Sequence, residues 1–353
     1  MKAIVVKDES DRAEVTEIPR PTPGEGEALI RTLRVGVDGT DREVIAGSYG
    51  GSPAGSDRLI LGHEAVGVVE EPNGTGFESG DIVVPMVRRP PPEGSDEFFR
   101  RGDPDMAPPG KTVECGIDRA DGFMCEYFTA PAEYLVETGP QTTDWGFLIE
   151  PLSVAEKALE QARTSRSTFQ WDAETVLVLG NGSLGLMAVG MHVDDATVYC
   201  LGRRDRPDPT VAIIERLGGV YVDSRETPVA EIPAVHEPAD LVFEATGHAN
   251  HAVECVDALA PNGVGVLLGI PESGRFEFDG AGFHKELVLH NKALVGSVNG
   301  GRRHFELATE TLASLPAWFF DDFVTTVAPL ESFESAFETG DTVIKTAIEF
   351  DTP

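Results

Sequence analysis

Positive charge is scarce in this chain. Its 353 residues include 28 Lys and Arg against 60 Asp and Glu, which gives a formal net charge of −32. Nucleic acids and anionic membrane surfaces carry phosphate charge, so this acidic excess argues against both as partners. An acidic surface repels itself unless salt screens it, and the screening length falls to about 3 Å in molar salt. The charge therefore predicts a halophilic protein of a salt-rich cytoplasm, against the alternative of a moderately acidic protein from ordinary salt.

Cysteine pairs and long hydrophobic runs are missing as well. The four cysteines show no C-x-x-C spacing and no disulfide framework, so we expect them to be reduced and buried. No segment approaches the roughly 18 apolar residues of a membrane helix. The apolar run at residues 3–6 is too short for a signal peptide. These absences predict a soluble, cytoplasmic protein.

The predicted fold class is α/β, with two domains. In residues 1–152, short β-branched runs are separated by Gly and Pro clusters, which is typical of a β-rich domain, and 88–110 is expected to be a long polar loop. In residues 153–292, strands and helices alternate, which predicts a doubly wound parallel sheet. The strands are expected at 4–6, 28–30, 66–69, 82–84, 176–179, 198–201, 241–244 and 264–268, and the helices at 154–162, 184–189 and 211–217. Residues 293–353 are expected to return to the first domain.

A glycine-rich turn follows the strand expected at 176–179. It consists of Gly180, Asn181, Gly182, Ser183, Leu184 and Gly185. In a dinucleotide-binding turn, the three glycines serve a tight turn, close approach of pyrophosphate and helix–strand packing. The amides at the start of the next helix then face the pyrophosphate. This context predicts a Rossmann nucleotide-binding site.

The end of the next strand carries Arg203 and Arg204. Enzymes that use NAD place a carboxylate here for the ribose hydroxyl, whereas two guanidinium groups suit the 2′-phosphate of NADP. A solvated surface pair is the alternative. In a chain with so few cations, the arginine pair favours NADP as the cofactor. The adjacent carboxylate of Asp205 is compatible with use of NAD as well.

Three segments of the first domain carry possible metal ligands. They are Asp38, the adjacent His63 and Glu64, and Glu150, which together supply one nitrogen and several carboxylate oxygens. A catalytic zinc ion takes three such ligands and keeps one position open. The alternatives are a structural histidine and an Asp38 that only forms an Asp-Gly turn.

Taken together, these motifs resemble the medium-chain zinc alcohol dehydrogenase superfamily over nearly the whole chain. The resemblance is closest to the halophilic archaeal glucose dehydrogenases, and it implies a GroES-like catalytic domain and a Rossmann domain. The segments that carry it are 37–41, 62–67, 80–84, 149–151, 180–185 and 296–299. It implies oxidation of β-D-glucose at C1 to glucono-1,5-lactone with NADP, in a homodimer or homotetramer. The rival interpretations are another polyol or alcohol dehydrogenase of the superfamily, a non-catalytic NADPH-binding protein and a zinc-free quinone reductase.

The resemblance also assigns roles to residues. Asp38 stands where most members have a cysteine ligand, which implies weaker zinc binding, and Cys115 alone at residues 90–115 implies a single zinc per subunit. Thr40 would relay the proton, and Glu64 and Glu150 would act in catalysis. Substrate contacts are expected from Thr40, Glu114, Glu150 and Asn299, with His290 near the same cleft. Further cofactor contacts are expected from Thr246, Leu268, Gly269, Ile270, Ser297, Val298 and Asn299.

Overall fold

The structure is a computed structural model that describes residues 1–92, 94, 96–271 and 274–352. It divides into two compact units, Met1–Ser153 with Asn299–Pro353 and Val154–Val298. The domain boundaries predicted from the sequence, 1–152, 153–292 and 293–353, stay a prediction. The second unit includes the strand Ala293–Gly296, which that prediction assigned to the returning segment. No helix among the described residues is long and apolar enough to cross a membrane.

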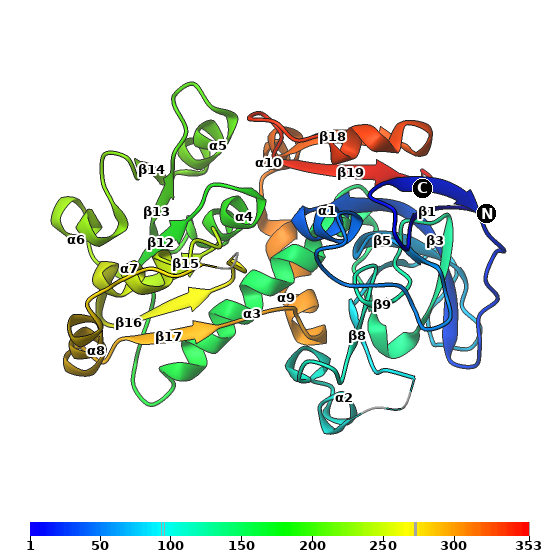
Figure 1. Cartoon of the computed structure of the whole chain (residues 1–353), viewed down its shortest axis with the longest axis horizontal. Helices are drawn as coiled ribbons and strands as arrows, with labels where there is room; N and C mark the ends of the chain where they lie inside the picture. The colour runs from blue at the N-terminus through cyan, green and yellow to red at the C-terminus, as the bar shows by residue number, and fades with distance from the viewer. Residues whose placement is uncertain (93, 95, 272–273, 353) are drawn as a thin grey trace. The chain divides into compact units, whose positions relative to one another are not determined.

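The main sheet of the first unit has seven strands and is built around the long strand β3 (Figure 1). β3 pairs antiparallel with β5 on one side and with the C-terminal strand β19 on the other. The strands of this sheet are β3 (Glu27–Val37), β5 (Glu64–Glu71), β6 (Ile82–Pro85), β10 (Tyr127–Pro131), β11 (Leu135–Glu137), β18 (Val324–Pro329) and β19 (Lys345–Glu349). The pairing of β19 with β3 brings residues 346–349 beside residues 34–37.

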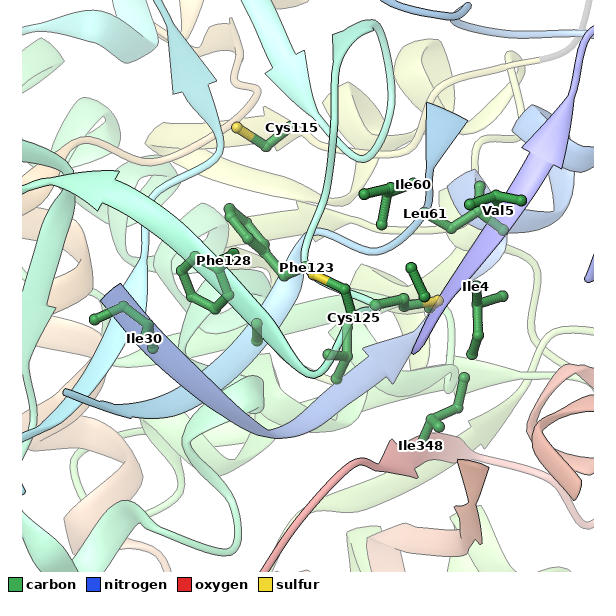
Figure 2. Close-up of a cluster of buried hydrophobic side chains, with 14 of the residues drawn as sticks. Ile4, Val5, Ile30, Ile60, Leu61, Cys115, Phe123, Cys125, Phe128 and Ile348 are labelled. Carbon is green, nitrogen blue, oxygen red and sulfur yellow. The ribbon is translucent and has the colours of Figure 1, made fainter. Parts of the chain in front are cut away.

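Two smaller sheets complete the first unit. One holds β1 (Lys2–Lys7), β2 (Ala13–Glu17) and β4 (Arg58–Ile60), and the other β7 (Arg88–Arg89), β8 (Val113–Cys115) and β9 (Arg119–Ala120). Apolar residues of β1, β3 and β19 share one buried cluster, in which Ile4 and Ile348 are fully buried (Figure 2). Burial of these apolar side chains holds the sheets together, because apolar area removed from water is the main favourable term in folding. All four cysteines are free and buried, as predicted.

The helices of the first unit correct one expectation and exclude one alternative. The segment 88–110 is not a long loop: it contains β7, the helix α2 (Glu97–Arg101) and the 3-10 turn Pro104–Met106. Asp96 caps α2 by accepting hydrogen bonds from two backbone amides. Asp38 is likewise not a plain turn residue, because it caps a helix that the sequence did not predict, α1 (Gly39–Ile45). The other helices are α9 (Arg302–Ser314) and α10 (Ala317–Phe323), with 3-10 segments at Ala132–Tyr134, Pro140–Thr142, Gly146–Leu148 and Leu330–Phe337.

The second unit is a Rossmann fold, as predicted. Its six parallel strands lie in the order β14-β13-β12-β15-β16-β17, so the strand order reverses between β12 and β15. The strands are β12 (Thr175–Leu179), β13 (Thr197–Gly202), β14 (Val220–Asp223), β15 (Ala239–Glu244), β16 (Leu259–Leu267) and β17 (Ala293–Gly296). The helices are α3 (Ile149–Ser165), which begins in the first unit, α4 (Ser183–His192), α5 (Pro209–Leu217), α6 (Ile232–Val235), α7 (His251–Ala258) and α8 (Gly280–Leu289), with a 3-10 turn at Val229–Glu231. Ligands of such folds bind at the carboxyl ends of the strands beside the reversal point.

Candidate functional site

A buried cluster of polar side chains lies in the first unit. His63, Glu64 and Glu150 each offer one ligand atom, and these atoms lie within 4.8 Å of one another. Their exposed fractions are 5%, 1% and 6%. His63 immediately precedes β5, Glu64 is its first residue, and Glu150 lies in the first turn of α3. Two elements far apart in sequence therefore bring three of the predicted ligands together.

Asp38 joins the same cluster from the start of α1. Its Oδ2 atom lies 3.8 Å from Nε2 of His63. A second group of possible ligand atoms, from Asp38, Asp41 and His63, also lies within 4.8 Å. The structure thus places the other three predicted metal ligands, Asp38, Glu64 and Glu150, around the His63 imidazole ring.

Asp41 is a member of the site that the sequence analysis missed. Its Oδ1 atom lies 3.8 Å from Nδ1 of His63, on the ring nitrogen opposite the one that faces Asp38. Its other oxygen accepts a hydrogen bond of 3.0 Å from the Asp38 amide. A carboxylate beside the second nitrogen orients a ligating histidine and raises its basicity. The capping box formed by Asp38 and Asp41 is the sequence signal that could have identified it.

Lys345 is the second member that was missed. Only 2% exposed, it is the first residue of β19, and its ammonium group forms an ion pair with Glu64. It also donates a hydrogen bond of 3.2 Å to the Val37 carbonyl oxygen. Gly36 leaves the space for Glu64, since a Cβ atom there would lie 2.1 Å from Glu64 Oε2. No local sequence motif indicates that Lys345 belongs to the site, because only the pairing of β19 with β3 brings it there.

Burial and neighbouring charges shift the ionisation of the cluster. Burial raises the pKa of Glu150 to about 8, and it also raises the pKa of Glu64, although the charge of Lys345 opposes this. Burial alone would lower the pKa of His63, but the neighbouring aspartates outweigh it and raise that pKa well above its ordinary value. Burial would raise the pKa of Asp38, but His63 and Lys345 outweigh it and lower that pKa. In the absence of a metal ion, the cluster therefore holds protons near neutral pH.

The donor set fits a zinc ion. An imidazole nitrogen and carboxylate oxygens are common zinc ligands, and three of them leave a position for water or substrate. Asp38, His63, Glu64 and Glu150 could hold the ion, since each places an atom within a few ångströms of His63 or of its neighbours. His63, Glu64 and Glu150 are buried, whereas the Asp38 side chain is 30% exposed. The arrangement can polarise an oxygen of a bound substrate.

The predicted proton relay and substrate residues lie in the same unit. The Thr40 hydroxyl donates a hydrogen bond of 3.3 Å to Asp38 Oδ2. Glu114 Oε1 accepts from Asn299 Nδ2 at 3.0 Å and from Arg88 Nε at 2.9 Å. The structure therefore brings Glu114 and Asn299 together across a long sequence separation. Arg88 was missed, because a half-buried arginine beside a proline run carries no distinctive signal.

A cavity of about 810 Å³ opens in the second unit. Of the predicted cofactor residues, the ones that line it are Gly180, Asn181, Gly182, Arg203, Arg204 and Thr246. Gly180 has a φ of +107°, which favours glycine. A Cβ atom at Gly185 would lie 1.9 Å from the Gly180 carbonyl oxygen, so the close packing of helix and turn also requires glycine. Ser183, Leu184 and Gly185 form the first turn of α4.

The other predicted cofactor residues follow the ends of neighbouring strands. Leu268, Gly269 and Ile270 follow β16, and Ser297 and Val298 follow β17, so they lie at the carboxyl edge of the sheet. The amides of Leu268 and Gly269 donate to the Glu244 carbonyl oxygen at 2.9 and 3.0 Å. Asn299 begins the returning part of the first unit.

The expectation for His290 is wrong. His290 follows α8 and precedes β17, at the amino end of that strand, whereas the cavity lies at the carboxyl edge of the sheet. Its side chain is 43% exposed and lies 3.7 Å from Glu286. It does not line the cofactor cavity.

Known proteins resemble both units. Residues 24–140 match the family model described as alcohol dehydrogenase GroES-like domain, and residues 143–350 match glucose dehydrogenase C-terminus. Glucose 1-dehydrogenase from Haloferax mediterranei is 60% identical over the full length of both chains, and the enzyme of the same name from Halobacterium salinarum is 56% identical over the full length of both. The solved structure of Haloferax mediterranei glucose dehydrogenase in complex with NADP, Zn and gluconolactone matches with a TM-score of 0.97 and 59% identity over the whole of both chains.

A more distant structure agrees on the fold alone. The 2R,3R-butanediol dehydrogenase from Bacillus subtilis matches with a TM-score of 0.80 at 21% identity, over 99% of each chain. The family models and the full-length relatives carry the assignment. The chain therefore belongs to the glucose dehydrogenase family, within the medium-chain zinc alcohol dehydrogenases.

Proposed function

We propose that the chain is an NADP- and zinc-dependent glucose dehydrogenase that oxidises β-D-glucose at C1 to glucono-1,5-lactone. One observation carries this: a relative 60% identical over its full length bears the name glucose 1-dehydrogenase, and the solved structure from the same organism holds NADP, Zn and gluconolactone. Gluconolactone is the product of two-electron oxidation of glucose at C1. The buried cluster around His63 and the arginine-lined cavity supply the two sites that such chemistry requires.

The proposed metal ligands are Asp38, His63 and Glu150, with Glu64 as an alternating ligand. When bound, zinc polarises the C1 oxygen of the sugar and stabilises negative charge there. Asp41 holds the His63 ring from the side opposite Asp38. Thr40 would accept the proton of the C1 hydroxyl on its oxygen and release its own proton to the surrounding water. In the structure its hydroxyl donates a hydrogen bond to Asp38 Oδ2.

The sugar is proposed to be held by Glu114, Glu150 and Asn299. Arg88 and Asn299 both donate to Glu114 Oε1, which fixes the carboxylate so that it can accept hydrogen bonds from sugar hydroxyls. In the second unit, the amides at the start of α4 receive the pyrophosphate, and Arg203 and Arg204 receive the 2′-phosphate. The residues that follow β16 and β17 are proposed to contact the nicotinamide half.

A comparison of substrates tests the function. The zinc-loaded protein in molar KCl should reduce NADP with β-D-glucose, and the sugar product should be gluconolactone or its hydrolysis product, gluconate. Sorbitol and 2,3-butanediol serve as matched substrates for the rival polyol and alcohol dehydrogenases. Turnover of either one in preference to glucose would keep the dehydrogenase assignment and overturn the substrate.

Zinc affinity is expected to rise with pH between about 6 and 8. The pKa of Glu150 is raised to about 8, and that of His63 is also raised, so the metal-free cluster holds protons that must leave when the metal binds. Raising the pH removes these protons beforehand and strengthens binding. Calorimetric zinc titrations in buffers of different ionisation heat measure both affinity and proton release. Affinity that is independent of pH, without proton release, would contradict these pKa shifts.

Thermal stability is expected to rise with salt. The net charge of −32 makes the folded chain repel itself at low ionic strength, and molar KCl screens that repulsion. Melts in 0.1 M and 2 M KCl should show a clear increase in Tm. An unchanged or lower Tm in 2 M KCl would argue against adaptation to salt.

Association into a homodimer or homotetramer is proposed through the edge of the Rossmann sheet, the usual place in the superfamily. β17 is one of the two edge strands of this sheet, and exposed apolar side chains follow or precede it, namely Val288 at 61%, Leu289 at 62% and Val298 at 46% exposure. Light scattering on the purified protein should give twice or four times the mass of the chain, and a monomer would refute the proposal.

A cytoplasmic location is supported by the four free, buried cysteines, which suit a reducing compartment.

A further inference from the structure

Tyr221, on β14 in the second unit, makes an unusual pair of contacts with the backbone of Arg204. Its hydroxyl oxygen accepts a hydrogen bond of 2.6 Å from the Arg204 amide. The same hydroxyl donates a hydrogen bond of 3.1 Å to the Arg204 carbonyl oxygen. One side-chain atom therefore satisfies both backbone groups of a residue that lies just beyond the end of β13.

The surrounding residues are shaped to admit this ring. Tyr221 is 7% exposed and packs beside Gly202, the last residue of β13, where a Cβ atom would lie 2.9 Å from Tyr221 Cε2. The Arg206 guanidinium lies 5.3 Å from the centre of the ring. Because β13 and β14 are adjacent parallel strands, the ring crosses from one strand to the turn that follows the other. Tyr221 thus extends the support of the sheet by two residues, as far as Arg204.

The turn that follows β13 carries several arginine side chains. Arg206 forms an ion pair with Glu215, and Arg225 forms ion pairs with Asp205 and Asp223, all at the surface. Arg203 and Arg204 line the cavity that begins at the glycine-rich turn. The two guanidinium groups that border the cavity therefore belong to the short segment that Tyr221 holds.

We propose that Tyr221 is a positioning residue for NADP: its hydroxyl fixes the backbone at Arg204 so that Arg203 and Arg204 present their guanidinium groups to the adenosine 2′-phosphate. The inference rests on the NADP dependence proposed above, and it names Tyr221 as a residue on which the preference for NADP depends. Bidentate recognition of phosphate by arginine is geometrically demanding, so a turn that moves freely would lose much of it. NADH, which lacks the 2′-phosphate, would not depend on this turn.

The test is the variant Tyr221→Phe, which removes the hydroxyl and keeps the ring. Dissociation constants are measured by the fluorescence of NADPH and NADH, without zinc or sugar, and by competition with adenosine 2′-monophosphate. Losing two hydrogen bonds should raise Kd for NADPH about tenfold, or about 1.4 kcal/mol, and leave Kd for NADH within about twofold. The binding of adenosine 2′-monophosphate should weaken in parallel with that of NADPH. In turnover, KM for NADP should rise while kcat holds.

Tyr199→Phe is the matched control. Tyr199 lies on β13, is also 7% exposed, and donates its hydroxyl hydrogen bond to Glu237 instead of to the turn. This variant should leave both dissociation constants unchanged. An unchanged Kd for NADPH in Tyr221→Phe would overturn the positioning role. An equal loss of NADPH and NADH binding would also overturn it, because the hydroxyl would then support the whole pocket. A parent protein that binds NADH as tightly as NADPH would instead overturn the NADP dependence itself.

Discussion

Replacing His63 with alanine is expected to lower kcat/KM for glucose by at least about a thousandfold, since a metal ion contributes several kcal/mol to transition-state stabilisation. His63 is the one nitrogen donor among the four proposed ligands, and both groups of close ligand atoms include it. Its loss leaves only carboxylates, which repel one another in a buried site. Steady-state kinetics and zinc content measured on the same preparation check the prediction.

The matched control is His284→Ala. His284 lies exposed on α8, in the second unit, and takes no part in the cluster. Activity and zinc content should match those of the parent protein. In His63→Ala, the Kd for NADPH should also stay unchanged, because the cofactor cavity is lined by residues of the second unit. A His63→Ala protein that keeps its zinc and a tenth or more of its activity would exclude His63 as a ligand.

Replacing Lys345 with methionine is expected to lower the free energy of unfolding of the metal-free protein by about 3–5 kcal/mol, the usual cost of removing one partner of a buried ion pair. Lys345 is 2% exposed and Glu64 is 1% exposed, so neither charge can be hydrated in the folded state. Without the ammonium group, Glu64 must either remain charged and unpaired or take up a proton. Urea denaturation in the presence of EDTA measures the change.

Two further variants separate this effect from general damage. Lys2→Met breaks a surface pair, in which the Lys2 and Glu331 side chains are 44% and 75% exposed, and should change stability by less than about 1 kcal/mol. The double variant Lys345→Met with Glu64→Gln should recover part of the lost stability, because it removes the unpaired charge. If Lys345→Met is no less stable than Lys2→Met, the buried ion pair does not support the fold as described.

The sequence predicted those parts of the molecule that are built from local signals. The Rossmann unit follows from apolar strands that alternate with helices, and the glycine-rich turn marks the strand that ends at Leu179. The packing role of Gly185 could be predicted from the spacing of the three glycines, and in the structure a Cβ atom there would lie 1.9 Å from the Gly180 carbonyl oxygen. The adjacent His63 and Glu64 could be predicted as ligands, and they form one half of the buried cluster. These features depend on neighbours in sequence, which a pattern can capture.

Contacts between distant segments could not be predicted in this way. Lys345 reaches Glu64 only because β19 pairs with β3, and that register is set by the packing of the whole sheet. Arg88 reaches Glu114 through the small sheet of β7 and β8. The helix α1 was not predicted because it is short and begins with Gly39, a residue that disfavours helices. Its capping residue, Asp38, was therefore compatible with a simple turn.

The most direct test of the account is glucose-dependent reduction of NADP in molar KCl by three samples: the protein as purified, the protein after EDTA, and the EDTA-treated protein after zinc is returned. The account predicts activity in the first, loss in the second and recovery in the third. The cluster of Asp38, His63, Glu64 and Glu150 would then act through zinc. Full activity after EDTA, in a sample shown to contain no zinc, would contradict it.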